Sequence, residues 1–265
     1  MCRWIAYKGD PLPLEHHVTR PRHSLVSQSL AARESTASVN GDGFGLGWYG
    51  EHEEPGLYRE IRPAWSDENL LYLCRHLRSH LFFAHVRAAT GTPVTRQNCH
   101  PFASGRWLFM HNGFIGSWQR LRRDVEGLIA DELYPSRQGT TDSEAIFLAI
   151  LSRGLAGGHD NVDPLAAVMQ TLADIGAVLD GAPFRFAAAL SNGEDLYAFR
   201  YAANDEANSL YLQETSSGVA IVSEPIDGEQ TRWTSVPRNH AVVSRGTKPV
   251  QVVPLELGPR ATRAA

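Results

Sequence analysis

From about residue 185 to its end, the chain is a succession of short segments with the composition of β-strands. Turn-forming residues separate them, and they read FRFAAAL, DLYAFRY, SLYLQE, GVAIVS, HAVVSR and PVQVVPL. Strand-like segments also open the chain, and segments with helical spacing of apolar residues lie in between. Strands, then helices, then strands predict an α+β fold in which helices cover sheets of largely antiparallel strands.

The first half of the chain supplies the opening strands. They read CRWIAY, FGLGW, GLYREI, LFFAHVR and WLFMHNG. In the second of them, Phe44, Leu46 and Trp48 alternate with glycines, which predicts one apolar face and a close approach of the backbone to a neighbour. We expect GLYREI to pair with this strand.

Helices are expected between the two groups of strands and among the first group. Their ranges are 25–35, 66–79, 117–128, 140–153 and 164–179. Ser66 has the position of an N-cap for the second helix. Cys74 lies at helical spacing with the leucines of that helix, so we expect its thiol in the core.

Composition and charge exclude several classes of protein. With 43% hydrophobic and 20% charged residues, we expect one globular domain over residues 2–258 and a disordered tail over residues 259–265. A net charge of −4 leaves no basic surface for nucleic acid. No apolar stretch approaches the roughly 20 residues that span a bilayer and no secretory signal is recognisable, so the protein is expected to be cytoplasmic and to bind no membrane. Three cysteines in this length argue for reduced thiols.

Cys2 follows a methionine that is usually removed when the next residue is small. Its removal would leave a thiol and a free α-amino group on one residue, which is a nucleophile with its own base. The structural alternative is that Cys2 is a small apolar residue of the first strand.

Arg87 and the pair Asn112–Gly113 each follow an apolar strand. A guanidinium at a strand end suits a bidentate grip on a carboxylate, although an arginine there can equally satisfy loop carbonyls. An Asn amide beside a glycine N–H can form an oxyanion hole, although Asn-Gly is also a favoured hairpin turn.

The stretch TTDSEAI opens the helix at 140–153. Thr141 and Glu144 have the spacing of a capping box. Asp142 is favoured in the first turn by the helix dipole, and its carboxylate could also accept hydrogen bonds from a ligand ammonium group.

Together these stretches resemble a known family. Cys2, the glycine-rich segment 40–45, HVRAAT, HNG and TTDSEAI occur in the order found in the class II glutamine amidotransferases, which are N-terminal nucleophile amidohydrolases. IVSEPID is similar to stand-alone members, a branch that includes γ-glutamyl hydrolases of thiol metabolism. The resemblance implies a four-layer αββα sandwich in which two antiparallel sheets lie between helical layers.

The resemblance also implies catalytic roles. Cys2 would be the nucleophile that forms a thioester with the γ-carbonyl carbon, and Asn112 and Gly113 would form the oxyanion hole. The α-amino group of Cys2 would carry the proton to the departing ammonia or amine. No metal or other cofactor is implied.

Four further residues would bind the glutamyl end of the substrate. Arg87 would hold the α-carboxylate and Asp142 the α-ammonium group, while Thr90 and Gly91 would line the same pocket. Both free glutamine and a γ-glutamyl small molecule carry this end, so either could be the substrate.

The chain departs from the synthase-linked members of the family, which resemble HTRWAT followed by His-Gly. Here Ala88 replaces the tryptophan and TGT follows. No segment after residue 185 resembles a synthase domain, so the protein is expected either to hydrolyse its substrate outright or to pass ammonia to a separate subunit. Association into a homo-oligomer would also fit the family.

Other readings compete with an amidohydrolase. The scaffold could be catalytically silent or depend on a partner, serving as a binding or regulatory subunit. A metal-dependent hydrolase would use some of the eleven histidines, such as His85, His100 and His111, but no His-Glu-x-x-His motif occurs. A nucleophile at Cys99 is a further alternative, although NCHPF is better explained as a wall of the pocket.

Overall fold

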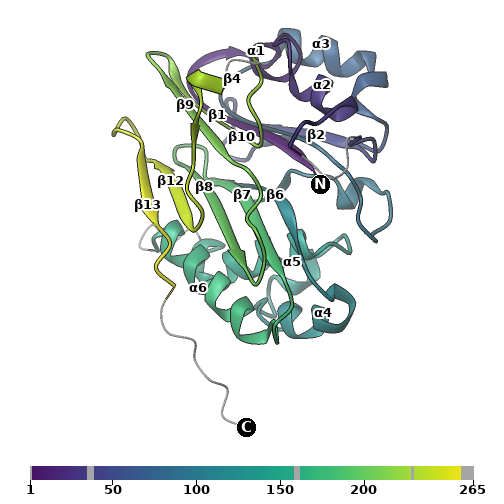
Figure 1. Ribbon diagram of the computed structural model, residues 1–265, viewed down its shortest axis with the longest axis vertical. Helices are drawn as coiled ribbons and strands as arrows, with labels where there is room; N and C mark the ends of the chain where they lie inside the picture. Colours follow the sequence, from purple (N-terminus) through teal and green to yellow (C-terminus); the bar gives the residue numbers. More distant parts are fainter. Residues whose placement is uncertain (1, 35–38, 158–161, 228–229, 258–265) are drawn as a thin grey trace.

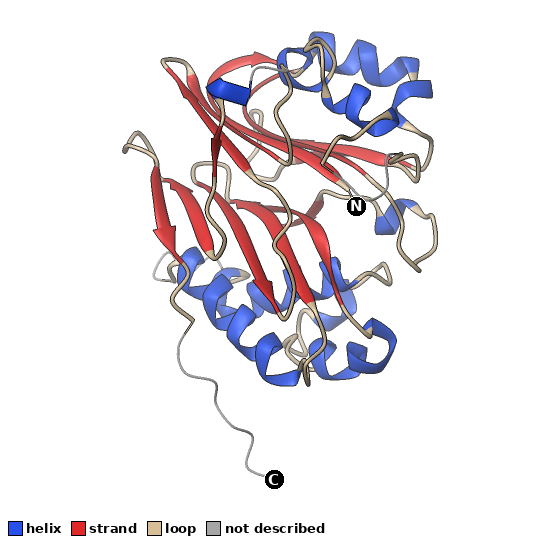
Figure 2. Ribbon diagram, in the orientation of Figure 1, coloured by secondary structure: helices blue, strands red, loops and turns tan. Residues whose placement is uncertain are grey.

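The computed structural model describes residues 2–34, 39–157, 162–227 and 230–257. The tail predicted at residues 259–265 lies outside these ranges. Two stacked sheets lie between two layers of helices (Figure 1), and the separation of strands from helices is clear in Figure 2. The fold prediction, a four-layer αββα sandwich, is confirmed.

One sheet has seven strands, with the start of the chain at its centre. In spatial order they are β11 (Thr234–Ser235), β9 (Tyr211–Thr215), β10 (Gly218–Val222), β1 (Arg3–Pro13), β4 (Arg78–Val86), β2 (Phe44–Trp48) and β3 (Gly56–Glu60). All neighbouring pairs described in this sheet are antiparallel.

The other sheet has six strands, which are also antiparallel. In spatial order they are β13 (Gln251–Pro254), β12 (His240–Ser244), β8 (Leu196–Ala203), β7 (Phe184–Ser191), β6 (Trp107–Ile115) and β5 (Phe102–Ser104). Each sheet therefore combines strands from the early and the late parts of the chain.

Each sheet carries helices on its outer face (Figure 1). The seven-stranded sheet is covered by α1 (Glu15–Val18), α2 (Leu25–Leu30) and α3 (Glu68–His76). The six-stranded sheet is covered by α4 (Trp118–Glu126), α5 (Asp142–Ile150) and α6 (Pro164–Val178). Among the described residues, no helix has the length and apolar character needed to cross a membrane.

Short helical turns complete the chain. They are η1 (Ala64–Ser66), η2 (Arg96–Asn98), η3 (Tyr134–Ser136), η4 (Leu151–Leu155) and η5 (Gln230–Arg232). η4 is a π-helical turn that continues α5 and ends it near Gly154, which has φ 97°. The helix predicted at 140–153 is thus shorter as a regular α-helix.

Alternation along the strands builds a core on each face. On β1, Ile5 and Tyr7 pack toward the helices, whereas Trp4 and Ala6 pack between the sheets. The indole N–H of Trp4 donates to the carbonyl oxygen of Ala187 in the other sheet at 3.1 Å. The space between the sheets is therefore a close-packed layer at this point.

The glycines of β2 are explained by this inner layer. A Cβ at Gly45 would lie 2.3 Å from the carbonyl oxygen of His100, and one at Gly47 would lie 2.7 Å from the Leu108 side chain. Phe44 and Leu46 face the helices instead. The predicted apolar face and close backbone approach are confirmed.

Two predictions about helix ends are wrong. The N-cap of α3 is Asp67 and not Ser66: the Asp67 carboxylate accepts a hydrogen bond from Leu70 N at 2.9 Å, while the Ser66 hydroxyl donates to Pro63 O. A carboxylate at this position also benefits from the helix dipole. The helix predicted at 25–35 ends at Leu30. Beyond it, the backbone N–H groups of Arg33 and Glu34 donate to the carboxylate of Glu224 and not to helix carbonyls.

Candidate active site

A cavity of about 550 Å³ lies at one end of the space between the sheets. It is reached by the start of β1, the segment after β4, the end of β6, the start of β7 and the first turn of α5. The residues that line it are Cys2, Arg87, Ala88, Ala89, Thr90, Thr92, His100, 111–118, 141–143 and Arg185. Of the seven predicted site residues, all but Gly91 line this cavity.

Cys2 reaches the cavity because it directly precedes β1 and follows the alternation of Trp4 and Ala6, which face the inner layer. Its Sγ lies 3.6 Å from Ala88 O and 3.5 Å from Ala88 N, at the end of β4. Burial raises the pKa of the thiol above its usual value of 9.0. Forming the thiolate near neutral pH therefore requires a base.

Asn112 lies on β6 and shares the inner face with Leu108 and Met110. Its side chain is 1% exposed, and neither Nδ2 nor Oδ1 has a hydrogen-bond partner among the described residues. The backbone is fixed, because Asn208 Nδ2 donates to Asn112 O at 3.0 Å. Leaving a buried amide unpaired costs about 1–3 kcal/mol, and a ligand in the cavity could remove that cost.

Only glycine fits at position 113. A Cβ there would lie 1.9 Å from Arg185 O and 2.4 Å from His111 Nε2. Asn112 and Gly113 pair with Ala187 and Phe186 inside the sheet, so they form no hairpin turn. The turn alternative for this dipeptide is wrong, because the strand continues to Ile115.

Arg87 is buried, 3% exposed, and leaves β4 toward the cavity. Its guanidinium donates to Thr92 Oγ1 at 2.8 Å and to Pro93 O at 3.2 Å. The group thus satisfies part of its own loop, as the structural alternative expects, while still lining the cavity. Gly91, with φ 75°, lies outside the cavity and lines an adjoining hollow together with Thr90.

Asp142 opens α5 and joins the helix to β6. Its carboxylate accepts hydrogen bonds from Ile115 N at 2.7 Å and from Ser143 N at 2.8 Å. The predicted capping box is only half formed: Thr141 Oγ1 accepts from Glu144 N, but the Glu144 carboxylate accepts from Gln138 N and Gly139 N. Glu144 therefore shapes the loop before the helix and does not close the box.

Of the three histidines named above, His100 and His111 line the cavity, and His85 contacts the ring of His100. The rings of His85 and His100 lie 4.3 Å apart between centroids with an angle of 30° between their planes, and His111 forms hydrogen bonds with Ser143 Oγ and Arg185 O. Burial lowers the pKa of His85 to about 3 and those of His100 and His111 below the usual value, so all three are neutral near pH 7. Within the described ranges, no group of three or more His, Cys, Asp and Glu side chains could hold a metal ion.

The other two cysteines are buried structural residues. Cys99 Sγ donates to Thr95 O and Glu60 O, and burial raises its pKa to about 11. Cys74 lies on the buried face of α3 and in the core, as predicted, and burial raises its pKa to about 12. Neither thiol lines the cavity that contains Cys2.

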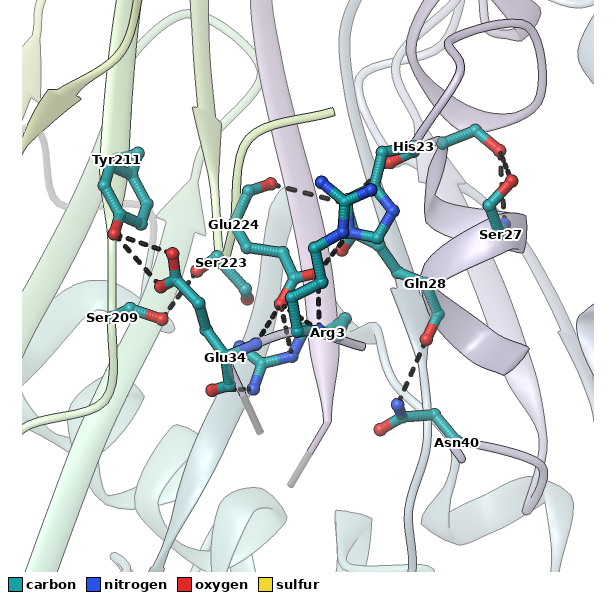
Figure 3. A network of polar contacts seen from close by, with 12 residues as sticks. Arg3, His23, Ser27, Gln28, Glu34, Asn40, Ser209, Tyr211, Ser223 and Glu224 are labelled. Atoms are coloured by element: carbon teal, nitrogen blue, oxygen red, sulfur yellow. Dashed lines mark hydrogen bonds and ion pairs between the residues drawn. The ribbon is translucent and has the colours of Figure 1, made fainter. Parts of the chain in front are cut away.

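A buried polar network, which the sequence analysis missed, includes Arg3, the residue that follows Cys2 in the chain (Figure 3). Glu224 forms an ion pair with Arg3 at 3.6 Å and a short contact with His23 Nε2. Its carboxylate also accepts hydrogen bonds from Arg33 N and Glu34 N. Glu224 belongs to IVSEPID, and a carboxylate inside an apolar strand-like run was the available signal for a buried charge.

Comparison with known proteins gives a consistent family. A model of the class II glutamine amidotransferases matches residues 17–243. The probable glutamine amidotransferase DUG3 of Saccharomyces cerevisiae is 34% identical over 90% of this chain and 80% of its own length. The γ-glutamyl-hercynylcysteine sulfoxide hydrolase of Mycolicibacterium smegmatis is 31% identical over 96% of this chain and 100% of its own length.

Solved structures agree with these sequence matches. A glutamine aminotransferase class-II domain protein of Silicibacter pomeroyi superposes with a TM-score of 0.72 at 35% identity, covering 95% of this chain and 98% of that chain. An allosteric regulatory enzyme of purine biosynthesis shares the fold at 13% identity, with a TM-score of 0.66 over 97% of this chain and 50% of its own. Family model, relatives and fold therefore agree that this chain belongs to the class II glutamine amidotransferases.

Proposed function

We propose that this enzyme cleaves the γ-amide bond of glutamine or of a γ-glutamyl small molecule through a thioester on Cys2. The observation that carries the proposal is the buried amide of Asn112, which lines the same cavity as Cys2 and has no hydrogen-bond partner within the described ranges. An amide donor kept free beside a thiol is the arrangement that acyl transfer through an oxyanion requires.

The nucleophile would be completed by removal of Met1. The α-amino group of Cys2 then has a reference pKa of about 7.7–8.0 and can accept the thiol proton, directly or through water. Partial burial raises the pKa of the Cys2 thiol, which favours a mechanism with a base close to it. The neutral His111 is engaged with Ser143 and Arg185, which leaves the amine as the better candidate.

The first half-reaction joins Cys2 Sγ to the γ-carbonyl carbon and breaks the bond from that carbon to nitrogen. Asn112 Nδ2 and Gly113 N would donate to the oxyanion as it forms. The departing nitrogen takes the proton held by the α-amine and leaves as ammonia or an amine. Water then attacks the thioester carbon, which releases the glutamyl acid and restores the thiol.

The glutamyl end would be held by two opposite charges. Arg87 would bind the α-carboxylate and Asp142 the α-ammonium group, with Thr90 beside them in the cavity wall. The yeast relative is a probable glutamine amidotransferase and the mycobacterial relative is a γ-glutamyl-hercynylcysteine sulfoxide hydrolase, which supports both free glutamine and a γ-glutamyl compound as substrates.

Intact mass before and after exposure to a glutamine-like diazoketone tests the proposal. We expect a chain without Met1 and one adduct mapped to Cys2, together with release of the glutamyl acid from glutamine or a γ-glutamyl amide. Release by the purified protein alone indicates outright hydrolysis, whereas release only with an added acceptor protein indicates ammonia transfer. Retained Met1 and no adduct would contradict the proposal and favour a silent binding subunit.

A further inference from the structure

Asn98 connects two loops that approach the cavity from different parts of the chain. It ends η2 and is 1% exposed. Its Nδ2 donates to Pro93 O at 2.9 Å and to Thr140 Oγ1 at 3.1 Å, and its Oδ1 accepts from Thr140 N at 2.8 Å. A single buried amide thus joins residues 42 positions apart through the Thr140 bonds.

The first loop carries Arg87. The carbonyl oxygen of Pro93 accepts from both Arg87 Nη2, at 3.2 Å, and Asn98 Nδ2. Thr92 Oγ1 also accepts a hydrogen bond from Arg87 Nη2, at 2.8 Å. The position of the Arg87 guanidinium is therefore tied, through one shared acceptor, to Asn98.

The second loop leads into Asp142. Thr140 bonds to Asn98 through both its N–H and its hydroxyl, and its carbonyl oxygen accepts from the indole N–H of Trp118 at 3.1 Å. The loop packs closely at the preceding residue, where a Cβ on Gly139 would lie 2.5 Å from Asn98 Oδ1. The approach to α5 is therefore fixed against Asn98.

We propose that Asn98 is a positioning residue that sets the spacing between Arg87 and Asp142. The inference rests on the proposed function, in which these two groups bind the α-carboxylate and the α-ammonium of one substrate. Both substrate charges are attached to a single carbon atom, so recognition at two points tolerates little change in the distance between the protein groups. Asn98 would thus govern binding of the glutamyl end while leaving the reactivity of the Cys2 thiol unaffected.

Two alkylating reagents separate these effects. A glutamine-like diazoketone needs the glutamyl site before it reacts with Cys2, whereas iodoacetamide carries no glutamyl group. Second-order rate constants for adduct formation on Cys2 would be measured by mass spectrometry with both reagents, alongside KM and kcat for glutamine.

For Asn98→Ala, we expect the diazoketone rate constant to fall about tenfold and KM to rise by a similar factor, which corresponds to one lost hydrogen-bonded link. The iodoacetamide rate constant and kcat should stay unchanged. The matched control is Asn192→Ala: Asn192 Oδ1 accepts from Glu194 N and Asp195 N in the turn at the far end of β7, and its loss should change neither rate constant.

Thr140→Val keeps the inference testable if Asn98→Ala folds poorly. It removes the hydroxyl that accepts from Asn98 Nδ2 and keeps the backbone N–H. We expect a smaller fall in the diazoketone rate constant than for Asn98→Ala, and no further fall when the two changes are combined.

Each other outcome overturns the inference. Equal slowing of both reagents in Asn98→Ala would show a general structural role, and unchanged rates with both would show no role. Full additivity of Asn98→Ala and Thr140→Val would show that the two residues do not act as one link. If the unsubstituted protein gives no diazoketone adduct on Cys2, the proposed function itself fails, and this inference fails with it.

Discussion

Glu224 and Asn112 are both buried polar residues close to the start of β1, but their surroundings differ. The Glu224 carboxylate contacts Arg3 and His23 and accepts hydrogen bonds from Arg33 N and Glu34 N (Figure 3). The Asn112 amide has no partner in the described part of the chain, although its own backbone is held by Asn208. One side chain uses its hydrogen-bonding capacity within the protein, and the other keeps it for the cavity.

The contrast indicates that the Glu224 network stabilises the fold, whereas Asn112 is available to a ligand in the cavity. A buried carboxylate that accepts from several donors holds together the segments that carry them. If those segments move apart, the carboxylate becomes an unpaired charge in a nonpolar interior, which is costly. A buried amide without partners lowers stability and is expected where a ligand supplies the missing bond. Substitutions on the two sides should therefore affect different properties.

The largest effect is expected at Cys2 itself. Cys2→Ser removes the thiol on the cavity side and leaves the partners of Glu224 in place, so turnover should be lost while the thermal unfolding temperature is retained. Cys99→Ser is the matched control, because that thiol lies outside the residues that line the cavity and donates to Thr95 O and Glu60 O. Measurable turnover in Cys2→Ser, or loss of turnover in Cys99→Ser, would place the nucleophile elsewhere.

Glu224→Ala should mainly lower stability. Removing one partner from a buried ion pair costs about 3–5 kcal/mol, here because the buried Arg3 guanidinium loses the carboxylate that balances its charge. Urea unfolding would measure the loss. Glu224→Gln keeps the oxygen that accepts from the backbone and should lose less; equal losses in the two variants would mean that the charge is unimportant.

Asn112→Ala should lower activity and leave stability largely unchanged, the reverse of what is expected for Glu224→Ala. We expect kcat to fall roughly 10²- to 10³-fold, as for other oxyanion-hole donors, with the free energy of unfolding unchanged or slightly higher. Steady-state kinetics and urea unfolding on the same preparation would test both parts. Near-normal turnover would remove Asn112 from the mechanism, and a large loss of stability would remove the contrast with Glu224.

The smallest effect concerns His17, a half-buried residue that packs against Tyr7 and Phe82. Its two ring nitrogens are buried and have no hydrogen-bond partner among the described residues. Burial lowers its pKa to about 4. The unfolded chain therefore binds more protons below about pH 6.5, and stability should fall toward pH 4 by up to about 1.4 kcal/mol per pH unit for this residue. His17→Phe should reduce that slope in urea unfolding at pH 7 and pH 5; an unchanged slope would mean that His17 is protonated when folded.

The sequence predicts the layers well because strand and helix patterns are local. The alternation of Phe44 and Leu46 with glycines identifies both faces of β2 without any knowledge of its neighbours. Helix ends are predicted less well. The end of α2 depends on hydrogen bonds to Glu224, which lies far along the chain and which no local pattern near residue 30 reveals.

The candidate site shows the same division. Cys2, Asn112 and Asp142 belong to recognisable short motifs, and the structure brings them to one cavity. Gly91 belongs to the same motif as Arg87 but turns away, because its loop bends at a positive φ. Asn98 escaped notice because its role depends on the spatial approach of Thr140, which spacing in the sequence does not show.

Because β1 lies between β4 and β10, the site can form during synthesis only after both of these strands have been made. β1 can pair with β4 once the ribosome has released residue 86, but its other neighbour, β10, ends only at residue 222, just before Glu224. Long-range antiparallel pairing of this kind is slow and comes late in folding. The nascent chain therefore holds Cys2 beside an incomplete sheet until residue 222 has emerged, and the site can be completed only after that point of synthesis.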